Sequence, residues 1–224
     1  MSHWEHRDEP RWKDFHFQQP YAKGLKRLRE DVLAPRPGRE DFDPATLWQW
    51  GTMQAMALVS VLEASERAFG VEGQRVVADA IEAIGLDVGH QILAGVAIPE
   101  GMTQAELVSF YATVINRIAY ASLEAPKIDD EGTVSFDILW CPHQDHYRAF
   151  DCRIQRYFVR GMMTALAELA GKQGWQVKFD STIPAGATTC HFTLWRATEA
   201  ESAAWDAHTQ LLEAKALVRR SAKT

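Results

Sequence analysis

The spacing of apolar residues changes once along this chain, near residue 120, and that change restricts the fold more than any other feature. From Pro44 to Ile118 apolar residues recur mostly at steps of three and four, which is the repeat of amphipathic α-helices. From Thr133 to Trp140 they alternate along the chain, which is the repeat of a β-strand with one buried face. A helical half followed by a mixed half is typical of an α+β fold.

The first two helices are marked by their ends. Asp43 and Pro44 are typical of a helix start, and Gly70 is expected to end the long helix that follows. A second helix is predicted over 73–86, with a break near 85–89 and a possible continuation over 90–96.

A third helix and the sheet complete the predicted domain. Thr103 and Glu106 form a capping-box pattern that opens a helix reaching Ile118. The remaining segments are predicted as follows: extended chain over 122–127, a turn at 129–132, strands over 133–140, 175–180 and 189–197, and helices over 145–170 and 199–219. The sequence therefore predicts a helical N-terminal half and a four-stranded, mainly antiparallel sheet covered by helices, in one domain over 45–224.

Residues 1–44 differ from this domain and are interpreted as an N-terminal arm. The segment combines five prolines and mixed charge with several aromatic residues that follow no sustained period. Because aromatic side chains gain much from burial, the arm is expected to pack on the body or on a partner subunit, so a homo-oligomer is an expected assembly. A short helix over 20–32 is possible within it.

Composition excludes several classes of protein. With 24 Lys and Arg against 30 Asp and Glu, the net charge is −6, which disfavours nucleic acid as a partner. We find no apolar run of the length needed to span a bilayer and no secretory signal, so neither a membrane nor export is expected. Three cysteines do not suggest a disulfide scaffold, and reduced thiols in a cytoplasmic protein are the simpler interpretation.

Two cysteines follow or begin strands of the predicted sheet. Cys141 ends one strand at the start of a predicted helix, where free N–H groups favour a thiolate. Cys190 lies in the last strand on the same face as Phe192 and Leu194, toward the core, whereas His191 points the opposite way.

One carboxylate is placed where burial is costly. Steps of about 100° per residue put Asp151 near the centre of the apolar arc of the 145–170 helix, so it should be paired or hydrogen-bonded. It could orient a histidine or act as a general base. Cys152 falls on the far side of that helix and is expected to be exposed.

Ordinary structural roles compete with each of these assignments. A buried cysteine is most often a small apolar side chain, Asp151 could cap a helix or form an ion pair, and His143 and His146 could be solvated. His90, in the glycine-flanked break between helices, could reach a cleft or merely end a helix.

A metal site is a further alternative for the same residues. Cys141, His143, His146 and Cys190 are ligand types that zinc accepts, but C-x-H-x-x-H is not a standard spacing. The sequence has no CxxC, HExxH, Walker or G-x-S-x-G pattern. No cofactor is therefore predicted, with zinc or another transition metal as the alternative.

Short motifs in the C-terminal half resemble the L-2-amino-thiazoline-4-carboxylic acid hydrolase-like family. They are Trp140-Cys141-Pro142, Asp151-Cys152, and the run 186–192, Gly-Ala-Thr-Thr-Cys-His-Phe. The likeness covers roughly residues 46–197, and leaves the arm and the last helix outside it. It implies cysteine-dependent opening of a small cyclic amidine or thiazoline at a C–N bond, with Cys190 and Cys141 matching the two family cysteines. The family usually has the cysteine before the acidic residue, whereas here Asp151 precedes Cys152.

These observations lead to three functional hypotheses, the third being a structural partner whose Trp-rich arm mediates assembly. In the first, the chain is a cysteine hydrolase of a small C–N-containing substrate: Cys190 attacks, His143 (favoured over His191) transfers the proton, Asp151 orients it, and Cys141 lies nearby. His90, His146 and His191 are assigned to substrate binding. In the second, the same residues enclose a small ligand, or a metal held by Cys141, His143 and Cys190, without turnover.

Overall fold

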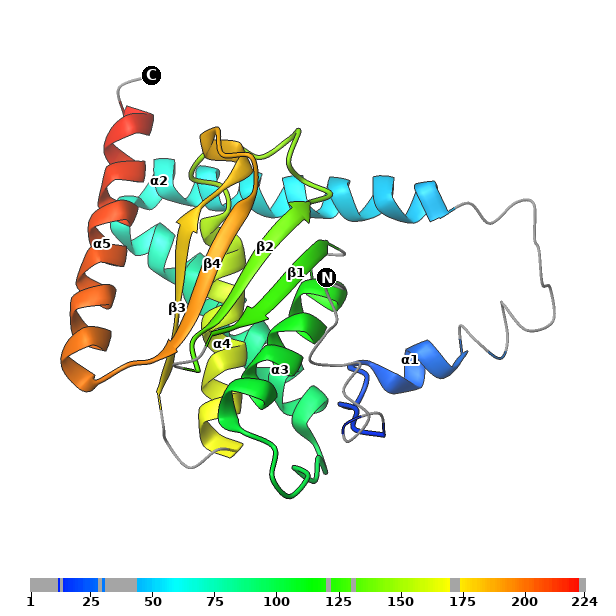
Figure 1. The fold of residues 1–224 in the computed structure, drawn as a ribbon. Coiled ribbons are helices and arrows are strands. Elements are labelled where there is room, and N and C mark those ends of the chain that lie inside the picture. The colour runs from blue at the N-terminus through cyan, green and yellow to red at the C-terminus, as the bar shows by residue number, and fades with distance from the viewer. Residues whose placement is uncertain are drawn as a thin grey trace.

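The structure is a computed structural model that describes residues 12, 14–27, 30, 44–119, 122–129, 132–169 and 174–221. Its elements, in chain order, are α1 (Ala22–Arg27), α2 (Pro44–Leu93), α3 (Gln104–Ala119), β1 (Leu123–Ile128), β2 (Val134–Trp140), α4 (Arg153–Leu169), β3 (Trp175–Ser181), the short 3₁₀ helix η3 (Ile183–Ala185), β4 (Cys190–Arg196) and α5 (Glu199–Ser221). Helices pack against a four-stranded antiparallel sheet, so the predicted α+β class is confirmed (Figure 1).

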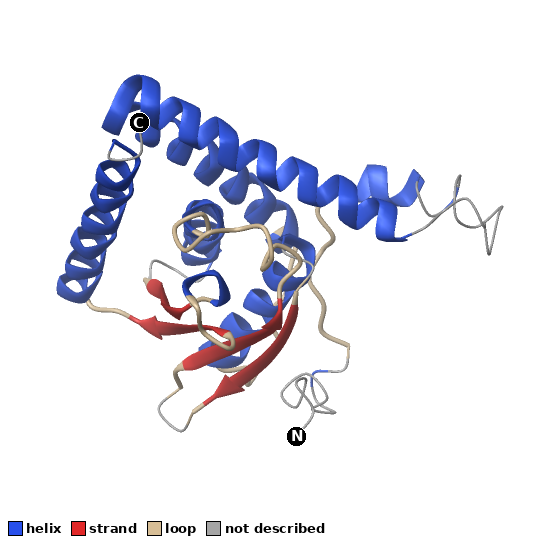
Figure 2. Cartoon of the chain, turned by 90° about the horizontal axis from the view of Figure 1, so that it is seen from above, coloured by secondary structure: helices blue, strands red, loops and turns tan. Residues whose placement is uncertain are grey.

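The strands are ordered β1-β2-β4-β3, and every neighbouring pair is antiparallel. Val134 and Phe136 of β2 and Leu194 of β4 are fully or almost fully buried, as the alternation in sequence predicts. Seen from above, α2, α3 and α4 lie on one side of the sheet, and α5 runs along the β3 side of the molecule (Figure 2). The buried strand face therefore looks toward α3 and α4.

Helix α2 contains the first correction to the predicted elements. Gly70, with φ of 59° and ψ of −133°, is non-helical and kinks the element, so the predicted boundary there is right. The predicted break near 85–89 is wrong, because the helix continues to Leu93. The glycines in that stretch interrupt the helical pattern in the sequence, but in the structure they allow α2 to pack closely against α4.

Helices α2 and α4 cross where glycine meets backbone. A Cβ on Gly85 would collide with the carbonyl oxygen of Phe158, and a Cβ on Gly161 would collide with the carbonyl oxygen of Glu82. On Gly89 it would lie 2.7 Å from the Cβ of Ala165. Only glycine allows the two backbones to approach this closely, which explains residues that would otherwise weaken a helix.

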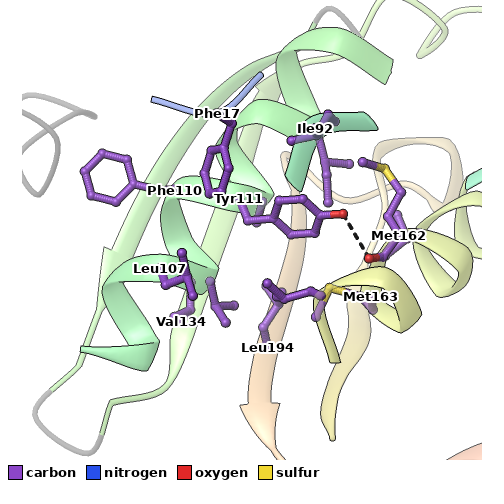
Figure 3. Packing of buried hydrophobic residues seen from close by; sticks show 14 of the residues in the cluster. Phe17, Ile92, Leu107, Phe110, Tyr111, Val134, Met162, Met163 and Leu194 are labelled. Atoms are coloured by element: carbon purple, nitrogen blue, oxygen red, sulfur yellow. Dashed lines mark hydrogen bonds between the residues drawn. The ribbon is translucent and has the colours of Figure 1, made fainter. Parts of the chain in front are cut away.

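The main core fills the space between these helices and the sheet (Figure 3). Tyr111 of α3 is completely buried, and its hydroxyl donates to the backbone oxygen of Met162 at 2.9 Å. Burial raises the pKa of Tyr111 well above its usual value, because the charged form would lose its hydration. The hydrogen bond ties α3 to α4 through a side chain that stays neutral.

The described part of the N-terminal arm packs on the body. Trp12 and Phe17 are buried, and the indole Nε1 of Trp12 donates to Glu106 Oε1 at 2.9 Å. The ring of Phe15 lies 5.7 Å from that of Phe110, edge to face. The expectation that these aromatics pack is confirmed for this stretch, whereas Val32 and most of the predicted arm lie outside the described residues.

Helix α4 starts later than predicted. Residues 141–152 form consecutive turns, and the helix begins at Arg153 rather than near Asp145. Local hydrogen bonds hold the turns, including Gln144 N to Cys141 O at 3.1 Å and Tyr147 N to His143 O at 2.9 Å. The segment between β2 and α4 therefore folds back on itself beside the sheet.

The first half of α2 exposes large apolar side chains. Trp50 and Met53 are about three-fifths exposed, and Leu47 and Trp48 also face solvent in large part. Across the described ranges, no helix combines the length and apolarity that crossing a bilayer would need.

The glycine crossing yields a stability prediction. Gly161→Ala should lower the free energy of unfolding by about 3 kcal/mol, because the new methyl forces the two helices apart. Gly51→Ala is the matched control, since a Cβ there meets nothing within 4 Å, and it should stabilise by up to about 1 kcal/mol. Urea unfolding midpoints measure both, and equal effects of the two substitutions would refute the crossing.

Candidate functional site

Strand pairing brings two of the three cysteines together. Strand β2 runs antiparallel to β4, with Ile138 opposite Cys190. Cys141 follows the last residue of β2, and Cys190 is the first residue of β4, so both lie at the same end of the sheet. The third, Cys152, directly precedes α4, where the chain returns from the turn segment.

The three thiols line a single cavity. Cys141, Cys152 and Cys190 share it with His143, Tyr147 and Gln155, and apolar side chains from the sheet, α3 and α4 complete the wall. Its volume is about 70 Å³. Because an apolar cavity of about 150 Å³ is known to bind benzene or xenon, this smaller cavity has room for part of such a molecule. The expected convergence of Cys141 and Cys190 is confirmed.

Burial keeps the thiols protonated. Loss of hydration raises the pKa of Cys141 and of Cys190 above the ordinary thiol value, and raises that of Cys152 to about 12. Backbone N–H groups oppose this only in part: Ile183 N donates to Cys190 Sγ at 3.1 Å, which lowers its pKa by less than burial raises it. The prediction that a helix start makes Cys141 a thiolate is wrong, because burial outweighs its backbone hydrogen bonds.

His143 is the buried polar side chain of this site. Only 9% of its surface is exposed, its ring stacks on that of Tyr147 with centroids 5.0 Å apart, and its Nδ1 has no hydrogen-bond partner among the described residues. Burial, followed by the nearby His146, lowers the pKa of His143, so the imidazole is neutral at pH 7. A neutral ring with a free nitrogen can donate or accept one hydrogen bond, according to its tautomer.

Asn116 of α3 supplies a second polar atom at the cavity wall. The residue is 1% exposed, and within the described chain its amide Nδ2 has no partner. A buried amide without a hydrogen bond costs about 1–3 kcal/mol, so both Asn116 and His143 would gain from a ligand with polar atoms.

A larger groove adjoins the thiol cavity. It has a volume of about 690 Å³ and is lined by the exposed start of α2, by α4, and by Tyr21 and Pro142. His143, Tyr147 and Gln155 line both spaces, so the cavity and the groove adjoin at these side chains. Small-molecule sites commonly measure a few hundred to 1,000 Å³, which brings the groove into that range.

The other predicted site residues lie elsewhere. Asp151 is buried as predicted, but it precedes α4 and accepts a hydrogen bond from Arg148 N at 2.8 Å rather than lining the cavity. His90 is half exposed beside Glu168, with 2.6 Å between Nε2 and Oε2. His146 is exposed near Trp48.

His191 points away from the cavity, as the strand alternation predicts. Its Nδ1 lies 3.0 Å from Asp137 Oδ1 on the opposite face of the sheet. His90, His146 and His191 are all absent from the cavity wall, so the structure brings together only His143 of the predicted histidines.

Sequence reasoning missed several side chains of the wall. The sequence predicts Cys152 on an exposed face, because the predicted helix begins near Asp145. In the structure α4 begins at Arg153, and the turns that precede it place Cys152 at the cavity wall. Tyr147 and Gln155 lacked a motif, although Gln155 Nε2 donates to Tyr147 Oη at 3.3 Å in the structure. Asn116 interrupts the apolar face of α3, and a polar residue within such a face was the available signal.

The described residues form no preformed set of metal ligands. Among the described residues, no group of three or more His, Cys, Asp or Glu side chains is close enough to hold an ion. The three thiols line one cavity, but they are not arranged as a coordination sphere.

The thiol pKa values predict how the cysteines react. Iodoacetamide should label all three slowly at pH 7, Cys152 slowest, because a pKa of about 12 leaves about a thousandfold less thiolate than an ordinary thiol has. Raised pKa values shift labelling to higher pH, so the rates should climb through pH 9–10. Peptide mass spectrometry gives each rate, and urea-unfolded protein is the control with ordinary profiles. Rapid labelling of folded Cys190 at pH 7 would contradict this ordering.

Comparison with known proteins gives one strong relation. No family model matches the chain. In structure, the chain is similar to a trafficking protein particle complex subunit 3 from Naegleria fowleri covalently bound to palmitic acid, with 10% identity and a TM-score of 0.48 over 66% of this chain and 95% of that chain. A likeness at this level carries no argument.

In sequence, the chain is 50% identical over 221 residues to a protein of Archaeoglobus fulgidus described as uncharacterized. The alignment covers 96% of both chains, and therefore includes the cavity-forming segments between residues 112 and 194. The chain belongs to the same family as this archaeal protein.

Proposed function

We propose that the protein binds a small, largely apolar molecule in the cavity formed by Cys141, Cys152 and Cys190, with part of the ligand extending into the adjoining groove. The observation that carries the proposal is an apolar cavity lined by three thiols, with an unpartnered His143 Nδ1 among the described residues of its wall. Neutral thiols are small, polarisable and weakly polar, so they suit an apolar surface.

Two polar atoms would orient the ligand. Asn116 Nδ2 donates hydrogen bonds only, and His143 Nδ1 serves as donor or acceptor. A ligand with one acceptor near Asn116 and an apolar body against the thiols satisfies both needs. Charged ligands are disfavoured in this cavity, since its walls raise the thiol pKa values by excluding water.

Ligand binding predicts a stabilisation that depends on the cavity. Benzene or indole at about ten times its dissociation constant should raise the melting temperature by about 3–6 °C. Cys190→Met, which fills the space, should abolish the shift, whereas Cys190→Ala, which enlarges it, should retain it. The measurement is a thermal melt of the full-length protein with each compound.

Native mass spectrometry of freshly purified protein adds an independent reading. A bound mass that disappears in Cys190→Met and survives in Cys190→Ala supports the proposal. A bare polypeptide mass together with unchanged melting temperatures across the compounds would refute it.

Cysteine-dependent hydrolysis of a small C–N-containing ring is the second candidate function. The favouring observation is the hydrogen bond from Ile183 N to Cys190 Sγ, which stabilises a thiolate on that cysteine. Neutral His143 lines the same cavity and has a free nitrogen that could accept the thiol proton. Cys141 would serve as a wall residue, and Asp151 would act only through the turn that it holds.

This candidate predicts a specific dependence on one sulfur. Ring opening of L-2-amino-thiazoline-4-carboxylate should fall at least about a hundredfold in Cys190→Ala and rise with pH in the wild-type protein, because ionisation supplies the nucleophile. Cys152→Ala is the control and should retain activity. Steady-state rates by absorbance decide the matter: turnover that is equal in both variants would exclude Cys190 as nucleophile.

A further inference from the structure

A second cavity lies on the other side of Cys152. It has a volume of about 240 Å³ and is enclosed by the first turns of α4, the η3 segment and one face of α5. Two arginines of α4, Arg153 and Arg156, line it, as do the hydroxyl-bearing side chains of Ser181, Thr182 and Thr209. The proposed small-molecule cavity is apolar, whereas this one is lined by two guanidinium groups.

Arg153 has more donors than its partners use. Its side chain is 8% exposed, and Nη2 donates to both carboxylate oxygens of Glu66 at 2.6 and 2.7 Å. Nε and Nη1 are buried, and among the described residues neither has a hydrogen-bond partner. A guanidinium carries five N–H donors, so the pair with Glu66 leaves Nε and both hydrogens of Nη1 without an acceptor. A buried donor that lacks a hydrogen-bond acceptor costs free energy, particularly on a charged group.

Arg156 presents a second guanidinium to the same space. Its carbon Cζ lies 4.9 Å from the centre of the Trp205 ring, and its Nη2 donates to Thr209 Oγ1. Burial lowers the pKa of Arg156, which marks a cation that has lost much of its hydration. Trp205 is held in turn by a hydrogen bond from its Nε1 to Val177 O at 3.0 Å, so the platform beneath the guanidinium is fixed.

Two acidic side chains, Asp180 and Glu213, also line the cavity, and Asp180 is already engaged. Lys178 Nζ lies 2.5 Å from Asp180 Oδ1, and Thr193 Oγ1 donates to Asp180 Oδ2 at 2.8 Å. Glu66 also accepts from Gln74 Nε2 at 2.8 Å. Glu213 lies near enough to Arg156 to raise its pKa, although burial lowers that pKa by more. The start of α4 adds the positive end of a 17-residue helix.

We infer that this second cavity binds an oxyanion, a carboxylate or phosphate group, between Arg153 and Arg156. Oxygen acceptors of the anion take the free Nε and Nη1 donors of Arg153 and the charge of Arg156. Thr182 lies at the wall as a further donor, whereas the hydroxyl of Thr209 already donates to Trp205 O at 2.9 Å. The site is separate from the proposed thiol cavity and does not depend on it, although Cys152, Phe179 and Thr182 line both.

Anion titrations of the full-length protein test the inference. Isothermal titration with sodium phosphate and with sodium acetate, in a chloride background of constant ionic strength, should show one saturable site. Arg156→Gln should weaken binding at least tenfold. Glu66→Gln should strengthen it at least threefold, because the competing carboxylate is removed while the amide can still meet Gln74. Tighter phosphate binding indicates a phosphate ester as ligand, and tighter acetate binding a carboxylate.

Arg160→Gln is the matched control, since this arginine of α4 is half exposed, pairs with Glu82 and does not line the cavity. It should leave the affinity unchanged. Circular dichroism melts establish that each variant is folded, and Glu66→Gln keeps the test valid should Arg156→Gln unfold. The inference is overturned if neither anion binds above the chloride background, or if Glu66→Gln fails to raise the affinity.

Discussion

Close contact between the backbones of α2 and α4 is the constraint on which the rest of the structure depends. Gly85 and Gly161 each sit against a carbonyl of the opposite helix, and no other residue could occupy either position without separating them. This contact fixes α4 beside the sheet, so its first turn reaches the end where β2 stops and β4 begins. Cys152 therefore meets Cys141 and Cys190, and Arg153 reaches Glu66 of α2.

Local signals predicted most of the elements. Alternation predicted the buried faces of β2 and β4, the capping box at Thr103 predicted the start of α3, and turn residues predicted the hairpin between β1 and β2. These features are determined by residues a few positions apart in the chain, so the sequence alone is enough to predict them. The position of His191 on the opposite face from Cys190 follows from the same two-residue period.

The errors arose where distant parts of the chain decide the local structure. Glycines near residue 85 resemble a helix break, yet tertiary packing against α4 keeps that helix intact. The turns over 141–152 are held by backbone hydrogen bonds that no residue pattern indicates. The predicted start of α4 is therefore too early, and the predicted exposed position of Cys152 is wrong. The unused donors of Arg153 depend on a glutamate 87 residues away, and sequence alone gives no sign of that pairing.

The two candidate functions of the thiol cavity make opposite demands on the same sulfur atoms. An apolar ligand is favoured by walls that exclude water, and exclusion of water is what raises the pKa of Cys190. A nucleophile needs the thiolate, which among the described residues only the N–H of Ile183 supports there. Burial outweighs that single hydrogen bond, so the cavity favours binding of an apolar ligand over catalysis. Catalysis would require the bound substrate to bring His143 within proton-transfer distance of Cys190. The unpartnered Nδ1 of His143 therefore distinguishes the two functions: it binds the ligand in one and accepts the thiol proton in the other.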